Sequence, residues 1–442
     1  MSNVSKQEVL ALCICLIASF PVLGQTGNEA LGSGAHENIT SGDYNVAIGD
    51  SAGFEIDNDL FTTFLGWGAG KGSRGSDNVY VGYKSGYSST TATDNTFVGA
   101  RTGESNTGTD NTFIGTKAGV SNTSGYNNTF IGEEAGEDNT TGHDNVFIGE
   151  DAGKESTIAD DNVFIGRFAG YRGGTGTPYY GSQDDSWISD YGIWSDNTAH
   201  GEGNVGIGSD ALSDIQSGRL NTAIGHVAGL DLGGGNGNTF IGGDAGSNTE
   251  SGDHNTFVGA LSGCDNNRTN NTNDANDNTY VGFMAGYKSR EGSNNVGMGA
   301  FSDFMDSYSG TERNVFIGSE SDIRGNDVTM LGFSGYVYAD KVVSAGANHY
   351  VRGNAGIGLG YAVNLSTEAD YSVSIGFEAQ NSAPNTIGLG RSNVVSGTGS
   401  IVIGANSTVS GENSIALGSD LNLSAANTVF LGNAATTSIG GT

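Results

Sequence analysis

A short pattern of apolar and polar positions recurs along most of the chain. Its core is the phrase Asn-(Thr/Val)-Phe-(Ile/Val)-Gly, found at residues 111–115, 128–132, 145–149, 162–166, 238–242, 255–259 and 314–318. The closing glycines are 16 or 17 residues apart from Gly49 to Gly166, and 14 apart from Gly376 to Gly432. A period of 14 to 17 residues is too short for a helical hairpin repeat and fits one coil of a β-solenoid.

The three residues between Asn and Gly predict a short strand in each coil. The residue before Gly is aliphatic, as in Ile114, and the residue two positions earlier is usually Thr, Val or Ile, as in Thr112. Because alternate side chains of a strand share a face, we expect these two positions to form one inward-facing ladder. β-branched residues suit such a pleated position.

The residue in the middle of the strand is expected on the opposite face, and it is often aromatic. An apolar stripe that faced solvent would be typical of an interface, so we predict that this column packs against other copies of the chain. The alternative is a wide coil that covers the column from within. The predicted interface residues are Phe97, Phe113, Phe130, Phe147, Phe164, Phe240 and Phe257.

Two further positions of the repeat predict corners. The Asn before each strand is expected to form a ladder at a turn and to bond the amide of its neighbour. An Ala-Gly pair follows the closing Gly after two variable residues, as in Ala118-Gly119, and its small size predicts a second, close-packed corner.

The period and its interruptions predict how the chain is organised. Residues 1–24 resemble an export signal, with an apolar run at 9–20 that is too short to span a bilayer. The remaining predicted segments are a flexible arm (25–40), coils of 16–17 residues (41–170), an aromatic-rich insertion (171–203), further coils (204–332) with an Asx-rich insertion (264–277), an insertion with the alternation of a β-hairpin (333–353) and further coils (354–442) that have a 14-residue period from about 372. About 22 coils are expected.

The aromatic-rich insertion is a candidate ligand or docking loop. Aromatic side chains on a loop held by a rigid scaffold suit glycan stacking or subunit docking, and the alternative is a small core that stabilises the loop itself. The candidate residues are Tyr179, Tyr180, Trp187, Tyr191 and Trp194.

Charge narrows the choice of partners. The formal net charge of −31 disfavours nucleic acid and anionic membranes, because contacts to phosphate require Lys and Arg. Carboxylates that precede the ladder Asn form a column with a spacing near that of stacked strands, so two neighbours could share a calcium ion. The candidate calcium ligands are Asp77, Asp94, Asp110, Asp144 and Asp161, with Asp57, Asp59, Asp265 and Asp274 as further candidates.

Catalytic and redox signals are weak. Residues 49–53 match a nucleophile-elbow pattern, but Ser51 occupies a slot that holds Lys84 and Arg101 in other coils, so the match is a coincidence of the repeat. Once the signal has been removed, Cys264 is the one cysteine that remains, which excludes a disulfide framework. We therefore expect no enzyme. Because the Thr column is expected to face inward, an ice-binding Thr array is not favoured either.

The 14-residue part resembles a known family. Ser400-Ile-Val-Ile-Gly404 and Asn413-Ser-Ile-Ala-Leu-Gly418, at a spacing of 14, are similar to the head repeats of trimeric autotransporter adhesins and of related secreted bacterial fibre proteins. The resemblance covers the repeats loosely in the 17-residue part and closely from Ser372 onward. It implies a left-handed parallel β-roll in which three chains pack side by side. No heptads or barrel-like strands appear before Thr442, so the family's anchoring mechanism is not implied.

Together these features predict a secreted, all-β, homotrimeric parallel β-solenoid at the cell surface. The favoured function is a structural subunit of an extracellular bacterial fibre whose trimers join end to end, with calcium as a candidate stabilising ion. The alternative is an adhesin head that binds a glycan or a host or surface matrix.

Overall fold

The computed structural model describes residues 26–172, 201–266, 275–304 and 311–433. The regular structure of these residues is entirely β-strand, and the chain forms two compact units, residues 1–234 and 235–442. The predicted all-β parallel β-solenoid is confirmed in both units, with about 23 turns in the described residues.

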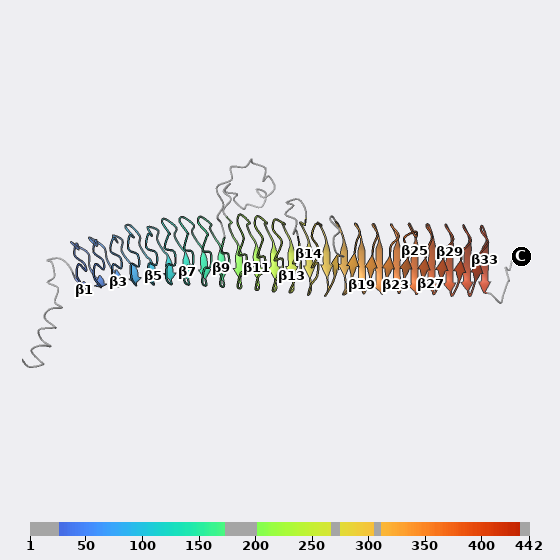
Figure 1. Ribbon diagram of the computed structural model, residues 1–442, viewed down its shortest axis with the longest axis horizontal. Helices are drawn as coiled ribbons and strands as arrows, with labels where there is room; N and C mark the ends of the chain where they lie inside the picture. Colours follow the sequence, from blue (N-terminus) through green and yellow to red (C-terminus); the bar gives the residue numbers. More distant parts are fainter. Residues whose placement is uncertain (1–25, 173–200, 267–274, 305–310, 434–442) are drawn as a thin grey trace, which may run out of the picture. The chain divides into compact units, whose positions relative to one another are not determined.

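Unit 1 contains one three-residue strand per coil (Figure 1). Each strand pairs in parallel with the next along the chain, so that Thr112 lies opposite Thr129 and Ile114 opposite Ile131. The strands are β1 (Glu29–Leu31), β2 (Val46–Ile48), β3 (Thr63–Leu65), β4 (Val79–Val81), β5 (Thr96–Val98), β6 (Thr112–Ile114), β7 (Thr129–Ile131), β8 (Val146–Ile148), β9 (Val163–Ile165), β10 (Val205–Ile207) and β11 (Thr222–Ile224).

Two predicted boundaries in unit 1 change. The arm predicted for 25–40 is wrong in part, because β1 pairs with β2 and His36 is buried. The aromatic-rich insertion leaves the solenoid intact, since β9 pairs directly with β10 and Val163 lies opposite Val205. Its five candidate aromatic residues lie outside the described residues, as do the predicted export signal and Asp274.

The middle residue of each strand points into the coil, so the predicted outward Phe interface is wrong. Phe97, Phe113, Phe130, Phe147, Phe164, Phe240 and Phe257 are fully buried within the single chain. In unit 1 their rings stack in one column, with centroids 4.7 Å apart for Phe113 and Phe130 and 4.8 Å for Phe130 and Phe147. This distance is the spacing of hydrogen-bonded strands, so the backbone imposes the ring stack.

In the long coils the inward ring packs against the Ala-Gly corner. The Gly of this pair has a positive φ, +58° at Gly136, and a Cβ there would lie 2.5 Å from the ring of Phe130. The glycine therefore lets this corner lie directly against the ring. Where the strand carries Gly206 instead of Phe, the corner carries a buried Leu212, which fills the same space from the other side.

The predicted Asn ladder is confirmed. In unit 1 the backbone N–H of Asn145 donates to Oδ1 of Asn128 at 3.1 Å, while Nδ2 of Asn128 donates to the carbonyl of Gly142 at 2.8 Å. The ladder continues across the insertion, where the N–H of Asn204 donates to Oδ1 of Asn162 at 3.0 Å. A left-handed backbone conformation lies one residue before the ladder Asn, for example at Asp144 (φ 57°).

Unit 2 begins with long coils and continues with short ones. Its main strands, also parallel, are β12 (Thr239–Ile241), β13 (Thr256–Val258), β14 (Thr279–Val281), β15 (Val296–Met298), β17 (Val315–Ile317), β19 (Thr329–Phe333), β21 (Val343–Ala347), β23 (Ile357–Tyr361), β25 (Val373–Phe377), β27 (Ile387–Arg391), β29 (Ile401–Ala405), β31 (Ile415–Ser419) and β33 (Val429–Asn433). The Asx-rich insertion does not interrupt the stack, because β13 pairs with β14.

The short coils add a second parallel sheet made of two-residue strands. These strands are β16 (Asp303–Phe304), β18 (Asp322–Ile323), β20 (Tyr336–Val337), β22 (Tyr350–Val351), β24 (Asn364–Leu365), β26 (Gln380–Asn381), β28 (Val394–Val395), β30 (Thr408–Val409) and β32 (Asn422–Leu423). The predicted hairpin at 333–353 is wrong, because β19 pairs in parallel with β21, and β20 with β22. The 14-residue spacing therefore begins at Gly318, earlier than residue 372, with one 16-residue step from Gly360 to Gly376.

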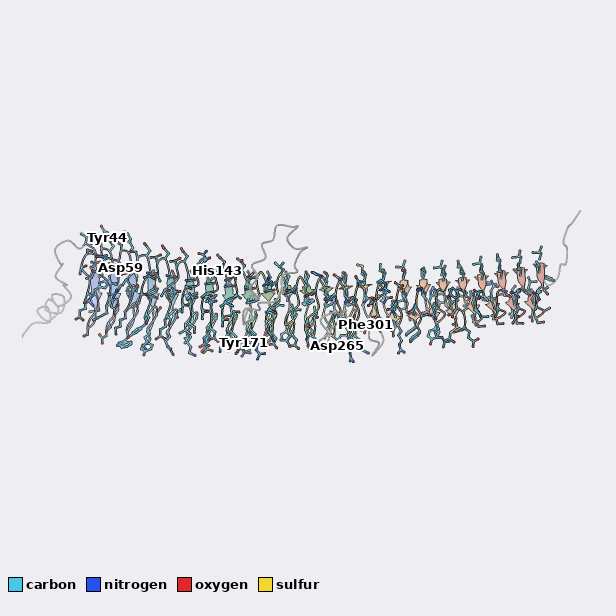
Figure 2. The ribbon with its side chains drawn as sticks, turned by 90° about the horizontal axis from the view of Figure 1, so that it is seen from above. Tyr44, Asp59, His143, Tyr171, Asp265 and Phe301 are labelled. Carbon is cyan, nitrogen blue, oxygen red and sulfur yellow. The ribbon has the colours of Figure 1, made fainter. Side chains whose placement is uncertain are left out.

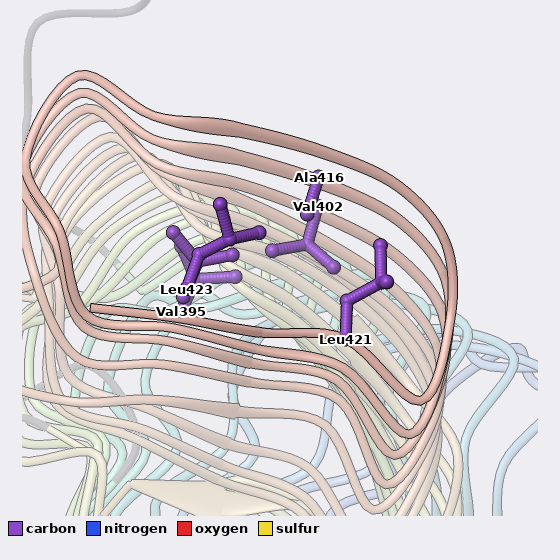
Figure 3. Packing of buried hydrophobic residues seen from close by; sticks show 6 residues of the cluster. Val395, Val402, Ala416, Leu421 and Leu423 are labelled. Atoms are coloured by element: carbon purple, nitrogen blue, oxygen red, sulfur yellow. The ribbon is translucent and has the colours of Figure 1, made fainter. Parts of the chain in front are cut away.

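The interior of the short coil is aliphatic and narrow. Val402 and Ala416, from the main strands, face Val395, Leu421 and Leu423, from the opposite side of the coil, and all five are buried (Figure 3). Hydroxyls replace the Asn ladder here. The N–H of Ser414 donates to Oγ of Ser400 at 3.0 Å, and Oγ of Ser400 donates to the carbonyl of Gly411 at 2.7 Å.

Candidate functional site

The outer face of the main strands is a repeated apolar surface in each unit. The aliphatic residue before Gly points outward, and Ile114 leaves 39 % of its surface exposed. The first strand position, such as Thr112, is half-buried on the same face. The predicted inward ladder is therefore wrong, and this includes the inward Thr column. The exposed members of the outward aliphatic column are Leu31, Ile48, Leu65, Val98, Ile114, Ile207 and Ile224 in unit 1, and Ile241, Met298, Ile317, Leu331, Ile375, Ile403, Leu417 and Leu431 in unit 2.

The orientation of the strands is the reverse of the predicted one, but the predicted apolar character of both strand faces remains. The strands are apolar on both faces, as the sequence indicated, but Phe fills the coil and Ile, Val and Leu face solvent. A parallel strand that is apolar on both faces is typical of a sheet covered on both sides. The one signal in the sequence that reveals the inner face is the exchange of Phe164 and Gly170 for Gly206 and Leu212 in consecutive coils.

The predicted carboxylate column lies at the turn that precedes each strand. Asp77, Asp94, Asp110, Asp144 and Asp161 are all exposed and all have a positive φ. Asn127 interrupts the column, and its Nδ2 donates to Oδ1 of Asp144 at 2.9 Å. Among the described residues, no group of three or more acidic, His or Cys side chains is placed to hold a metal ion. Calcium at this column stays a prediction.

The other predicted calcium ligands differ from one another in burial. Asp57 is exposed, whereas Asp59, two residues later, is only 6 % exposed, and its Oδ2 has no hydrogen-bond partner. Burial, followed by the charge of Asp57, raises the pKa of Asp59 to about 6, and Arg74 acts in the opposite direction. Asp265 is also buried, but its Oδ1 accepts a hydrogen bond from Nδ2 of Asn248 at 3.0 Å.

Exposed aromatic side chains flank the outer face in the first coils of unit 1, and the sequence reasoning missed them. The rings of Trp67 and Tyr83, which directly follow closing glycines, stack with centroids 5.3 Å apart. Tyr44 and Phe61, which lie in the turn column, stack at 5.4 Å (Figure 2 labels Tyr44). Reading the turn residues coil by coil would have found them, because Tyr44 and Phe61 occupy the slot that holds Asp77 and Asp94 later.

The backbone at Ser51 does not differ from that of the equivalent residues in other coils. It lies at a corner with φ 60°, a conformation shared by Lys84, Arg101, Lys117 and Glu134 at the same position of other coils. The structure thus places the nucleophile-like motif in a repeated corner, as the sequence indicated.

Comparison with known proteins agrees with this architecture. Within the described ranges, no helix has the length and apolar character needed to cross a bilayer. None of the curated proteins matches the chain significantly. Residues 382–420, which belong to the short coils of unit 2, match two copies of the YadA head domain repeat, the repeat of a trimeric autotransporter adhesin head.

Proposed function

We propose that this protein is a structural and adhesive surface protein that self-associates as a homotrimer through the outer face of its main strands. The observation that supports this most directly is the outward aliphatic column. Copies that cover one another along this column would remove it from water, at roughly 25 cal/mol for each Å² of apolar surface buried.

Three copies are favoured over two by the adhesin-type repeat. The matched repeat belongs to heads that form homotrimers and are exposed on bacterial cells. The match covers the short coils, and the long coils carry the same outward column. We therefore extend the trimer to both units and infer that the protein is exported to the cell surface.

The experiment is the oligomeric state of the full mature chain, measured by light scattering coupled to size exclusion at micromolar concentration. Wild type should have three times the chain mass. Ile114→Asp in unit 1 and Ile403→Asp in unit 2 should each shift the population toward monomer, because each buries a charge in the contact. Ser105→Asp, which adds the same charge at an exposed turn, should remain trimeric.

A wild-type monomer in dilute buffer would contradict the proposal, as would Ile114→Asp and Ile403→Asp chains that remain trimers. Circular dichroism of each variant separates loss of assembly from loss of folding.

Within this function, we favour a fibre subunit whose trimers join end to end. A terminal β-coil presents unpaired strand edges that can template a further subunit. Electron microscopy of the purified trimer tests this: filaments support the fibre, whereas separate particles of one length favour an adhesin head held by another component.

The adhesin alternative draws on the YadA-type repeat and on the exposed ring pair of Trp67 and Tyr83. Binding to immobilised glycans or matrix proteins, compared between wild type, Trp67→Ala and the pair Trp187→Ala and Trp194→Ala, tests both aromatic sites. Unchanged binding in all variants would remove the aromatic residues from ligand recognition.

A further inference from the structure

Four buried oxygen atoms in the first coils of unit 1 have no hydrogen-bond partner. They are Oδ2 of Asp59, Oγ of Ser73, the hydroxyl of Tyr80 and Oγ of Ser89. The residues belong to consecutive coils, and all but Asp59 are fully buried. Buried polar atoms are nearly always paired in native proteins. The hydroxyls of Tyr80, Ser73 and Ser89 lie within reach of one another, so the atom that most clearly lacks a partner is Oδ2 of Asp59.

The four side chains are close enough to influence one another. Burial raises the pKa of Tyr80, the hydroxyls of Ser73 and Ser89 partly offset this rise, and the charge of Asp59 adds to it. The Tyr at this position is itself unusual, because the next five coils of unit 1 that carry a ring here carry Phe, which has no hydroxyl.

Among the residues that the structure describes, none is a dedicated counterion for Asp59. The one cation that acts on it is Arg74, whose side chain is 62 % exposed and forms an ion pair with Glu55 at 3.0 Å. The charge of Asp57 lies nearby and makes the environment more negative. A buried carboxylate without a partner is costly, because its charge has left water without a compensating interaction.

We propose that Asp59 is the central ligand of a cation site in the first coils of unit 1, and that the ion is calcium. The four atoms of this cluster are oxygen, the donor that hard cations prefer, and the exposed Asp57, two residues before Asp59 (labelled in Figure 2), would supply a second negative charge. The hydroxyls of Ser73, Tyr80 and Ser89 complete the lining, and water or backbone carbonyls would supply the other ligands.

The proposed site differs from the carboxylate column in its burial. Asp94 and its equivalents are exposed and solvated, so they gain little from a bound ion. Asp59 is buried away from water, so a cation bound there would offset the free-energy cost of burying its charge. This inference concerns a single chain and does not depend on trimer formation.

The test is calcium-dependent stability of the full mature chain after dialysis against a chelator. Wild type should unfold at a higher temperature when millimolar CaCl₂ is added, because an ion that binds only the folded state stabilises it by mass action. Asp59→Asn, which keeps the shape and removes the charge, should lose this shift. The matched control Asp94→Asn, an exposed carboxylate of the same unit, should keep it.

The variant should fold, because Asp59→Asn removes an unpaired buried charge and should unfold in chelator at the wild-type temperature or above it. Terbium, which replaces calcium in oxygen sites and is sensitised by nearby tyrosine, gives a second readout. Its emission should be much weaker for Asp59→Asn than for wild type, and Tyr80→Phe should lower emission more than it lowers terbium affinity.

Two results would overturn the proposal. The first is the absence of any calcium shift in wild type, and the second is an equal shift in wild type and Asp59→Asn, which would place the ion elsewhere. The trimer measurement stays independent, because Asp59 lies inside the coil and away from the outward aliphatic column.

Discussion

The long coils of unit 1 and the short coils of unit 2 fill their interiors in different ways. Both carry parallel strands with an outward aliphatic column. The long coil has one strand and fills its interior with a stacked ring, as at Phe130. The short coil has a second strand opposite the first, which leaves room only for side chains such as Val402 and Val395. Two or three residues per coil thus decide between an aromatic and an aliphatic core.

The polar ladder, by contrast, is conserved in role across this change. Asn128 in the long coil and Ser400 in the short coil each accept from the backbone N–H of the next coil and donate to a Gly carbonyl. Core size therefore depends on coil length, whereas pairing at the turn does not.

The largest expected loss of stability distinguishes the aromatic core of the long coils from the aliphatic core of the short coils. Phe130→Ala should destabilise unit 1 by about 3–5 kcal/mol, because it removes a whole ring from the stack. Val402→Ala should destabilise unit 2 by roughly 1–3 kcal/mol, because it removes two methyl groups. Hydrogen exchange resolved by peptide reports on the two units separately. Equal losses would mean that the ring of Phe130 contributes no more to the long coil than Val402 contributes to the short coil.

The exchange between ring and corner tests whether the long coil is one complementary space. Leu212→Gly should cost about 2–5 kcal/mol by leaving a cavity, and Gly206→Phe about 1–3 kcal/mol by overpacking. The double variant restores the Phe–Gly combination of Phe164 and Gly170 and should regain most of that loss. Additive losses in a thermal unfolding cycle would show that the two positions do not share a space.

Removal of a ladder side chain should destabilise the long and the short coils equally. Asn128→Ala and Ser400→Ala each leave one buried backbone N–H of the next coil unpaired, at a cost of about 1–3 kcal/mol. Peptide-resolved exchange of the Asn145 and Ser414 amides measures this directly. A loss confined to the long coil would show that the hydroxyl ladder is dispensable.

The smallest expected effect is a response of the short coils to acid. Burial lowers the pKa of His349, and its hydrogen bond to the carbonyl of Gly360 partly offsets this. The unfolded chain then takes up the proton first, so the stability of unit 2 should fall as the pH drops below 6.5. His349→Gln should reduce this slope in unfolding curves measured between pH 8 and 5. An unchanged slope would exclude His349 as its source.

The sequence alone determined the period, the parallel solenoid, the Asn ladder and the apolar character of both strand faces. These follow from spacing and from the alternation of side chains along a strand. Which face points inward was decided only in three dimensions, because it depends on what the opposite side of the coil offers: the corner at Gly136 for the ring of Phe130, and Val395 for Val402.

The candidate calcium site was likewise predictable only in part from the sequence. The sequence identified Asp57 and Asp59 as carboxylates of interest, but treated them together with the exposed Asp94. Only the tertiary structure separated them, because the burial of Asp59 and its missing partner depend on neighbouring coils. The second strand of the short coils and the parallel course of 333–353 were hidden for the same reason: two-residue strands carry too little alternation to be seen before their partners are known.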